Sequence, residues 1–187
     1  LLAMVDASVG GKTGFDHPAG KNLVGTIYQP NAVVVDTAHL ATLAVRELRA
    51  GLAEVVKIAL ATSTALFERL EAEHAALLDP SSVALLEIIR EAIALKARIV
   101  RDDERESGRR AILNLGHTLG HALEAHGGYR KWLHGEAVSL GLVREVTSQK
   151  LFAWEEGSWH HAQDAAQRRP RDKHVVAYDF GMKRNIL

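Results

Sequence analysis

The chain has 187 residues, of which 47% are hydrophobic and 25% are charged, a composition typical of a soluble globular protein and not of a disordered one. Lys and Arg together number 23 and are balanced by 23 Asp and Glu, so the charge predicts no general binding to nucleic acid or to a membrane surface. The sequence has no cysteine, which excludes disulfides, thiolate metal sites and cysteine nucleophiles and favours a cytoplasmic protein, and no apolar run is long enough to span a membrane.

The first 40 residues are rich in turn-forming glycine and proline and end in AVVVD at residues 32–36. This run of valines predicts a buried strand. The segment starts without an initiator Met, inside what reads as a strand or loop, and we expect further sequence before it in the whole protein.

A glycine-rich stretch within this segment, DASVGGKTGFDHPAGKN at residues 6–22, places Lys12 and Lys21 beside glycines. Exposed backbone N–H groups next to a lysine can hold a phosphate, although such a stretch can also be an ordinary solvated turn. The letters GKT resemble the end of a P-loop, but Asp6 stands where that motif needs its first glycine. We therefore reject a nucleotide triphosphatase.

From Arg46 onward, apolar residues recur at three- and four-residue spacing, which predicts helices near residues 46–60, 63–78, 81–103, 109–126 and 134–150. The first of these carries Glu54 among apolar neighbours. A carboxylate is seldom buried without a partner, so Glu54 either binds a metal ion or pairs with Lys57 at i,i+3.

Histidines mark the last two helical segments. His117 and His121 are four residues apart, so they lie about one turn apart on the same helix face, and His134 opens the next segment. Imidazoles from two helices and a carboxylate would form a catalytic zinc set. Spacing alone favours His117 and His121 as paired metal ligands, with His134 or Glu136 as the third ligand. The alternative is that the histidines are hydrogen-bonded core residues. The HExxH pattern of a zinc protease is absent.

Charged residues surround the histidine segment. Lys96 precedes it on the third predicted helix, and Arg110 lies in the first turn of the fourth. They could bind an anionic substrate or simply belong to a solvated helix end. The composition changes again near residue 144, where a linker and then a strand at residues 174–178 are predicted.

Several long motifs give a resemblance to a known family. MVDASVGGKTG, HPAGKNLVGTIYQP, RELRAGLAEVVK, DERESGRRAILNLGHTLGHALEAHGGY and WLHGEAVSLG are together similar to 3-dehydroquinate synthase. The resemblance implies a mainly α fold with a small β-containing N-terminal segment and a truncated C-terminal helical domain. Residues 1–45 would be a remnant of the NAD-binding α/β domain, and residues 46–143 the helical zinc and substrate domain.

The tail at residues 144–187 resembles another protein. LVREVTSQKLFAWEEGSWHHAQ and HVVAYDFGMKRNIL are similar to the small, glutaminase subunit of carbamoyl-phosphate synthetase, as its linker and the first strand of its amidotransferase domain. The chain is therefore interpreted as a composite, a chimera of two enzymes.

The first resemblance also implies an activity. Members of the family are phosphorus–oxygen lyases of the shikimate pathway that use NAD and Zn2+, with Co2+ possible, to convert the keto-sugar acid phosphate DAHP into 3-dehydroquinate. With most of the α/β domain missing, we expect impaired NAD binding and weak turnover. A homodimer is one assembly that the sequence allows. Another sugar-phosphate cyclase, or a non-catalytic metal-binding helical module, is the alternative.

Residue by residue, the resemblance implies three groups of site residues. The metal ligands would be Glu54, His117 and His134. The catalytic and substrate-binding residues would be Lys57, Lys96, Arg110, Asn114 and His121, the last as a substrate-side or proton-relay group and not a ligand. The cofactor-binding residues would be Asp6, Lys12, Lys21, Asn22, Thr42 and Leu43.

Overall fold

A computed structural model describes residues 1–17 and 20–147 of the chain. The chain divides into two units, Leu1–Leu142 and Val143–Leu187, and the fold and site below belong to the first unit. The predicted strand of the tail and the predicted linker beyond residue 147 lie outside the described residues, whereas residues 144–146 belong to a helix. Among the helices that are described, none combines the length and the apolar character that crossing a membrane requires.

The described part is mainly helical, as predicted. Its α-helices are α1 (Val45–Thr62), α2 (Thr64–Glu73), α3 (Val83–Asp102), α4 (His117–His126) and α5 (His134–Val146). Shorter turns are the π-helical η1 (Ala3–Ala7) and the 3-10 turns η2 (Thr37–Thr42), η3 (Ala76–Leu78) and η4 (Arg109–Asn114). The prediction of a single helix over residues 109–126 was wrong, because Gly116 adopts a left-handed conformation with φ 78° and separates η4 from α4.

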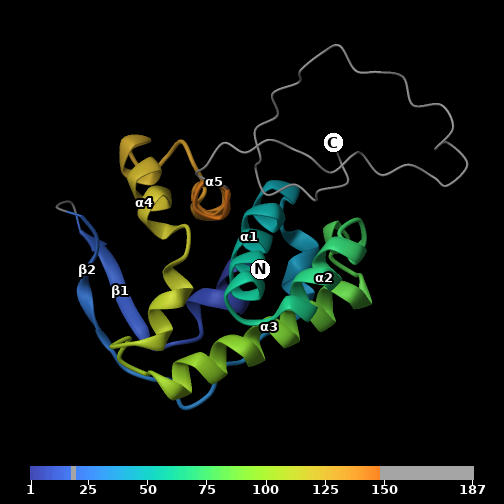
Figure 1. Ribbon diagram of the computed structural model, residues 1–187, viewed down its shortest axis with the longest axis horizontal. Coiled ribbons are helices and arrows are strands. Elements are labelled where there is room, and N and C mark those ends of the chain that lie inside the picture. The colour runs from blue at the N-terminus through green and yellow to red at the C-terminus, as the bar shows by residue number, and fades with distance from the viewer. Residues whose placement is uncertain (18–19, 148–187) are drawn as a thin grey trace, which may run out of the picture. The chain divides into compact units, whose positions relative to one another are not determined.

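The hydrophobic core lies between α1, α2 and α3 (Figure 1). The N-terminal turn η1 packs against α1 and α3. On α3, the buried side chains Leu85, Ile88 and Ile89 recur at three- and four-residue spacing. Because this spacing keeps them on one helix face, α3 packs through that face against α1, α2 and η1. The core holds α1, which carries part of the site, in a fixed position.

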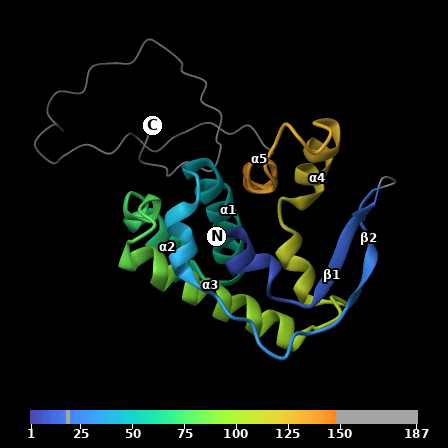
Figure 2. The same ribbon diagram turned by 180° about the vertical axis from the view of Figure 1, so that it is seen from behind.

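A two-stranded antiparallel sheet, the only sheet among the described residues, forms a hairpin at one edge of this unit (Figures 1 and 2). It consists of β1 (Lys12–His17) and β2 (Gly20–Ile27), with Phe15 opposite Val24 and an irregularity between Phe15 and His17. The hairpin leaves large apolar side chains open to solvent, with Phe15 60% and Leu23 59% exposed.

The strand predicted at residues 32–36 is wrong. This segment has no regular secondary structure, and Val34 is 91% exposed. Valines favour an extended backbone, but a strand also needs a neighbour to satisfy its N–H and C=O groups. The described residues offer these valines no strand to pair with, so the local preference alone does not produce one.

Close helix contacts at glycines bring α1, α4 and α5 together. A Cβ on Gly135 would lie 1.8 Å from the carbonyl oxygen of Ala50, and a Cβ on Gly141 would lie 1.9 Å from that of Gly116. The backbone of α5 therefore lies directly against α1 and against the residue that precedes α4. Since His134 precedes Gly135 in the chain and His117 follows Gly116, both histidines are brought toward the same part of α1.

Candidate metal and anion site

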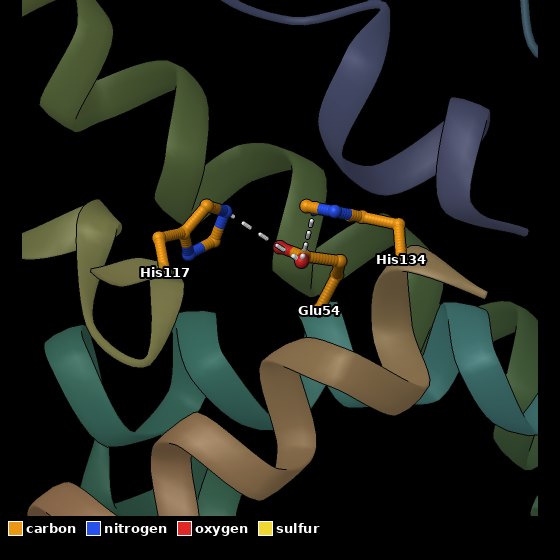
Figure 3. Close-up of side chains that lie close together, drawn as sticks. All are labelled: Glu54, His117 and His134. Atoms are coloured by element: carbon orange, nitrogen blue, oxygen red, sulfur yellow. Dashed lines mark ion pairs between the residues drawn. The ribbon is translucent and has the colours of Figure 1, made fainter. Parts of the chain in front are cut away.

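Three side chains from three helices converge at one point (Figure 3). Glu54 on α1 is fully buried, and His117 and His134 are the first residues of α4 and α5. Nε2 of His134 lies 3.3 Å and Nε2 of His117 lies 4.0 Å from Oε1 of Glu54. One ligand atom from each residue lies within 4.8 Å of the others. Ligands that bind zinc at about 2.0–2.2 Å stand about 3–4 Å apart, so the spacing suits a cation.

The carboxylate of Glu54 is the feature that most clearly suits a metal ion. Lys57 Nζ forms an ion pair with Oε2, as the i,i+3 spacing predicts, yet neither carboxylate oxygen has a partner in hydrogen-bond geometry. Burial raises the pKa of Glu54, but the nearby His134 and Lys57 outweigh burial and hold that pKa below its ordinary value. A buried carboxylate that stays ionised without hydrogen bonds is suited to a metal ion.

The pKa values of the two imidazoles of the triad are shifted in opposite directions. Burial and the nearby Lys57 ammonium lower the pKa of His117, so its ring is neutral near pH 7. Nδ1 of His117 lies 3.2 Å from the carbonyl oxygen of Leu115 and donates to it, which leaves the lone pair on Nε2. The contact with Glu54 raises the pKa of His134. A proton would therefore compete with a metal more strongly at His134 than at His117.

His121 lies beside the triad and not in it. Its ring centroid is 5.3 Å from that of His117 and 5.6 Å from that of His134, and its side chain is 54% exposed. Among the described residues, the possible metal set that contains His121 pairs it with Glu124 and His134, and not with His117. The pairing of His117 with His121 that spacing favoured is therefore not the arrangement of the structure.

Glu136, the other third ligand that spacing allowed, is engaged elsewhere. Its carboxylate accepts from Arg46 at 2.6 and 2.8 Å and from the backbone N–H of Leu133 at 2.9 Å. The hydrogen bond from Arg46 lowers the pKa of Glu136 to about 2. Glu136 therefore stabilises the start of α5, in the manner of a helix cap, and is not part of the triad.

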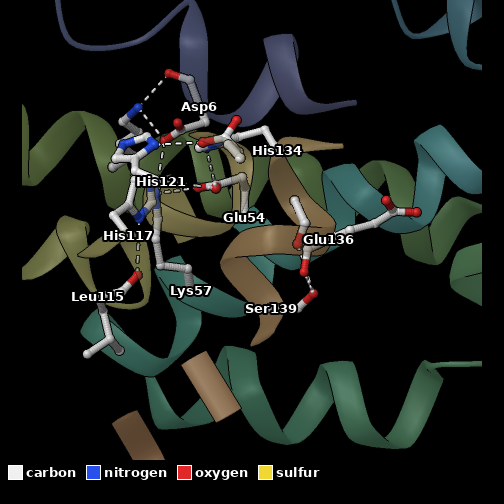
Figure 4. A network of polar contacts seen from close by, with 12 residues as sticks. Asp6, Glu54, Lys57, Leu115, His117, His121, His134, Glu136 and Ser139 are labelled. Atoms are coloured by element: carbon white, nitrogen blue, oxygen red, sulfur yellow. Dashed lines mark hydrogen bonds and ion pairs between the residues drawn. The ribbon is translucent and has the colours of Figure 1, made fainter. Parts of the chain in front are cut away.

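Lys57, Lys96 and Asp6 form a group of ion pairs, called the lysine cluster below. It adjoins the triad through Lys57 (Figure 4). Nζ of Lys96 lies 2.5 Å from Oδ1 of Asp6, and Nζ of Lys57 lies 3.5 Å from the same oxygen. Burial raises the pKa of Asp6, but the two lysines prevail and lower it. Asp6 is therefore ionised, and it connects η1 to α1 and α3 beside the metal triad.

Further cations lie toward the hairpin. Lys12 forms an ion pair with Glu106, which also accepts from Nδ2 of Asn114 at 2.6 Å. The guanidinium of Arg110 is buried and donates to the carbonyl oxygens of Gly10 and Glu104 at 2.8 and 2.6 Å. Burial lowers the pKa of Lys12, and the positive charges of Arg110 and Lys96 lower it further. Gathered cations of this kind favour a bound anion.

The other residues predicted to bind the cofactor lie on different elements from the triad. Asn22 is in β2 with φ 54°, Thr42 ends η2 and donates to the carbonyl oxygen of His39 at 3.0 Å, and Leu43 is partly buried against the core. The side chain of Lys21 lies outside the described part of the structure. Asp6, in contrast, lies in the lysine cluster.

Two acidic residues of the site, Glu124 and Glu106, are not among the site residues predicted from the sequence. Glu124 follows His117 by seven positions and His121 by three, so the helical spacing of α4 could have identified it. Glu106 lies in a charged loop with φ 56°, and its contacts with Lys12 and Asn114 depend on chain folding that no local pattern reveals.

Solved structures with the same fold define a class of cyclase. The chain is 33% identical to 2-epi-5-epi-valiolone synthase from Streptomyces hygroscopicus subsp. jinggangensis 5008, solved with NAD+ and Zn2+ bound, with a TM-score of 0.70 over 76% of this chain and 40% of that one. It is 32% identical to 2-deoxy-scyllo-inosose synthase complexed with carbaglucose-6-phosphate, NAD+ and Co2+, with a TM-score of 0.68 over 76% and 38% of the two chains. The mainly α fold is thus that of these cyclases.

The sequence comparisons narrow this class. Residues 1–50 match the N-terminal family and residues 51–175 the C-terminal family of 3-dehydroquinate synthase. The 3-dehydroquinate synthases of Azotobacter vinelandii and Teredinibacter turnerae are 56% and 54% identical over 154 residues, 82% of this chain. The chain belongs to the 3-dehydroquinate synthase family. It spans 42% and 43% of the lengths of these relatives, and the domain boundaries given above stay a prediction.

Proposed function

We propose that this chain provides the metal-binding and substrate-binding part of a 3-dehydroquinate synthase, which converts DAHP into 3-dehydroquinate with release of phosphate. The observation that carries the proposal is the fully buried Glu54, whose carboxylate oxygens lack hydrogen bonds and face imidazoles from two other helices. A carboxylate with two imidazoles is a ligand set of catalytic zinc sites, and it leaves coordination positions for water or substrate.

Glu54, His117 and His134 would hold the metal, with Co2+ able to replace Zn2+ as in the inosose synthase complex. When bound, the ion would act as a Lewis acid that polarises hydroxyl and keto oxygens of the substrate. The exposed ring of His121 would accept or return a proton beside that position, because its side chain is open to solvent and its Nδ1 is held by Glu124.

The basic residues would hold the substrate's anionic groups. Lys57 and Lys96 lie beside the triad and would bind the carboxylate of DAHP, with Asp6 fixing both ammonium groups. Lys12 and Asn114, which share Glu106 as a partner, would exchange that contact for the phosphate. Arg110 would support this region by its charge.

We propose that NAD contacts Asp6, Lys12, Lys21, Asn22, Thr42 and Leu43, in line with the NAD+ bound to the valiolone synthase. Weak NAD binding by this chain, a homodimer and a cytoplasmic location stay predictions. When bound, NAD would supply hydride transfer. The residues of this chain would orient the dinucleotide for it.

A zinc titration of the 187-residue chain tests the metal site. We expect one Zn2+ per chain in the wild type and in His39→Ala, whose exposed histidine lies on η2, and loss of binding in His117→Ala. If wild type and His117→Ala bind zinc alike, or neither binds it, the histidines are packing residues and the non-catalytic helical module is the better account.

Substrate binding separates the family activity from that of the other cyclases to which the fold is similar. DAHP carries a carboxylate as well as a phosphate, whereas glucose 6-phosphate and sedoheptulose 7-phosphate lack the carboxylate. We expect the zinc-loaded chain to bind DAHP most tightly, and Lys96→Met to remove that preference, because Lys96 belongs to the lysine cluster. Tighter binding of either of the other two phosphates would favour a different sugar-phosphate cyclase.

A further inference from the structure

Glu124 on α4 is an acidic residue with 3% exposure that neither the metal triad nor the lysine cluster includes. Its two carboxylate oxygens contact two different histidines. Oε2 lies 2.6 Å from Nδ1 of His121, and Oε1 lies 3.2 Å from Nδ1 of His134. One buried carboxylate thus connects a proposed metal ligand to the proposed proton-relay group.

With Glu124 ionised, these contacts determine which nitrogen of each ring carries hydrogen. An ionised carboxylate can only accept hydrogen bonds, so Nδ1 of His121 and Nδ1 of His134 must both be donors. In a neutral ring the lone pair is then on Nε2. Nε2 of His134 is the atom that lies 3.3 Å from Oε1 of Glu54, on the side of the ring that faces the triad. The tautomer that Glu124 selects is therefore the one that can bind a metal.

We propose that Glu124 is a positioning residue that holds His134 as an Nε2 metal ligand and holds His121 in the same tautomer beside it. The proposal rests on the metal site described above. A carboxylate behind a ligating histidine makes the ring more basic and restricts its rotation, which strengthens metal binding. Since the same carboxylate binds His121, a change at Glu124 alters both the ligand and the group that moves protons.

The same atoms could instead hold a second metal, because His121, Glu124 and His134 also lie close enough to share an ion. In that arrangement Nδ1 of His134 would be a ligand and could not donate to Glu124. The two arrangements predict different stoichiometries. A positioning role requires one ion per chain, whereas a second site requires two.

The test uses the full chain with Glu124→Gln and Glu124→Leu, and with Glu136→Gln as a matched control. Glu136 is a carboxylate in the first turn of α5, but it binds Arg46. Zinc and Co2+ affinities are measured against a competing chelator, and the visible spectrum of the Co2+ protein reports the geometry of the ligands. Far-UV circular dichroism establishes that each variant is folded.

Loss of Glu124 in the leucine variant should weaken metal binding by about 10–100-fold and change the Co2+ spectrum. The amide of Glu124→Gln can accept from only one of the two rings, so we expect a smaller loss. Glu136→Gln should match the wild type in both measurements, because the amide oxygen of glutamine can still accept from the N–H of Leu133 at the start of α5.

Equal affinities and spectra in wild type and both Glu124 variants would overturn the positioning role and leave the triad intact. Binding of two ions per wild-type chain would also overturn it. If the wild type binds no metal at all, the proposed function fails first, and the role of Glu124 fails with it.

Discussion

The helical part of Leu1–Leu142, called the helical unit below, and the hairpin of β1 and β2 both carry charged residues of the site, but they are built differently. On α1, α4 and α5 the polar residues of the site are held by buried neighbours, with Glu54 fully buried and Lys57 2% exposed. On the hairpin, Lys12 forms its ion pair from a ribbon whose Phe15 and Leu23 side chains face solvent. The metal triad is thus positioned by a core, whereas the hairpin contributes residues without a core of its own.

This difference indicates which functions the described residues can support by themselves. Burial removes competing water and fixes side-chain rotamers, so a buried triad can be preorganised. Cofactor contacts from an exposed ribbon have no such support. We therefore expect metal and carboxylate binding to depend on the helical unit, and phosphate and NAD binding to depend more on the position of the hairpin.

The largest expected effect comes from removing a triad ligand. Glu54→Gln should abolish measurable zinc binding, because the neutral amide removes the charge that the ion would neutralise. Lys12→Ala, the matched change on the hairpin, should leave zinc affinity unchanged. Both are measured by competition with a chelator. A comparable loss in Lys12→Ala would break the distinction between the two regions.

The next effect concerns stability. Ile88→Ala removes a fully buried side chain of α3 and should lower the free energy of unfolding by about 2–5 kcal/mol. Phe15→Ala on the hairpin should change it by less than about 0.5 kcal/mol, since Phe15 is 60% exposed. Urea unfolding of both variants measures this. A large loss in Phe15→Ala would show that the apolar face of the hairpin is covered in solution.

The glycine contacts of α5 give a smaller effect. Gly135→Ala places a Cβ against the carbonyl oxygen of Ala50, and the resulting shift of α5 should cost about 1–3 kcal/mol and weaken zinc binding. In Gly108→Ala the new Cβ would lie 3.8 Å from its nearest neighbour, so this control should unfold like the wild type. Thermal melts with and without zinc compare them. Equal behaviour would argue against close packing of α5 on α1.

The smallest effect is the pH dependence of the metal-free chain. Because the pKa of His134 is raised in the fold, its protonated form stabilises the fold below the unfolded pKa of about 6.5, and this stabilisation is lost as pH rises through the folded pKa. The pKa of His117 is lowered in the fold, so its contribution to stability has the opposite slope: the fold loses stability as the pH falls below about 6.5. The stability difference between wild type and His134→Gln should therefore shrink above pH 6.5. A constant difference from pH 5 to 9 would contradict the raised pKa.

Much of the helical fold could be predicted from the sequence, because the three- and four-residue spacing of α1 and α3 arises from the same core that the helices bury. The predictions were wrong where structure depends on distant partners. The valines at residues 32–36 lack a strand to pair with, and Gly116 interrupts a helix that periodicity alone would continue.

The site was predictable to a similar degree. The motifs identified Glu54, His117 and His134 through resemblance, whereas spacing alone paired His117 with His121. Spacing within one helix cannot show how α5 lies against α4, and that packing decides which ring faces Glu54. Their roles as metal ligands stay a proposal.

Anomalous diffraction from crystals of the zinc-loaded chain tests the central claim most directly. We expect a single zinc peak at about 2.0–2.2 Å from a carboxylate oxygen of Glu54 and from Nε2 of His117 and His134. A peak bound by His121 and Glu124 instead, or zinc-soaked crystals without a peak at the triad, would contradict the account.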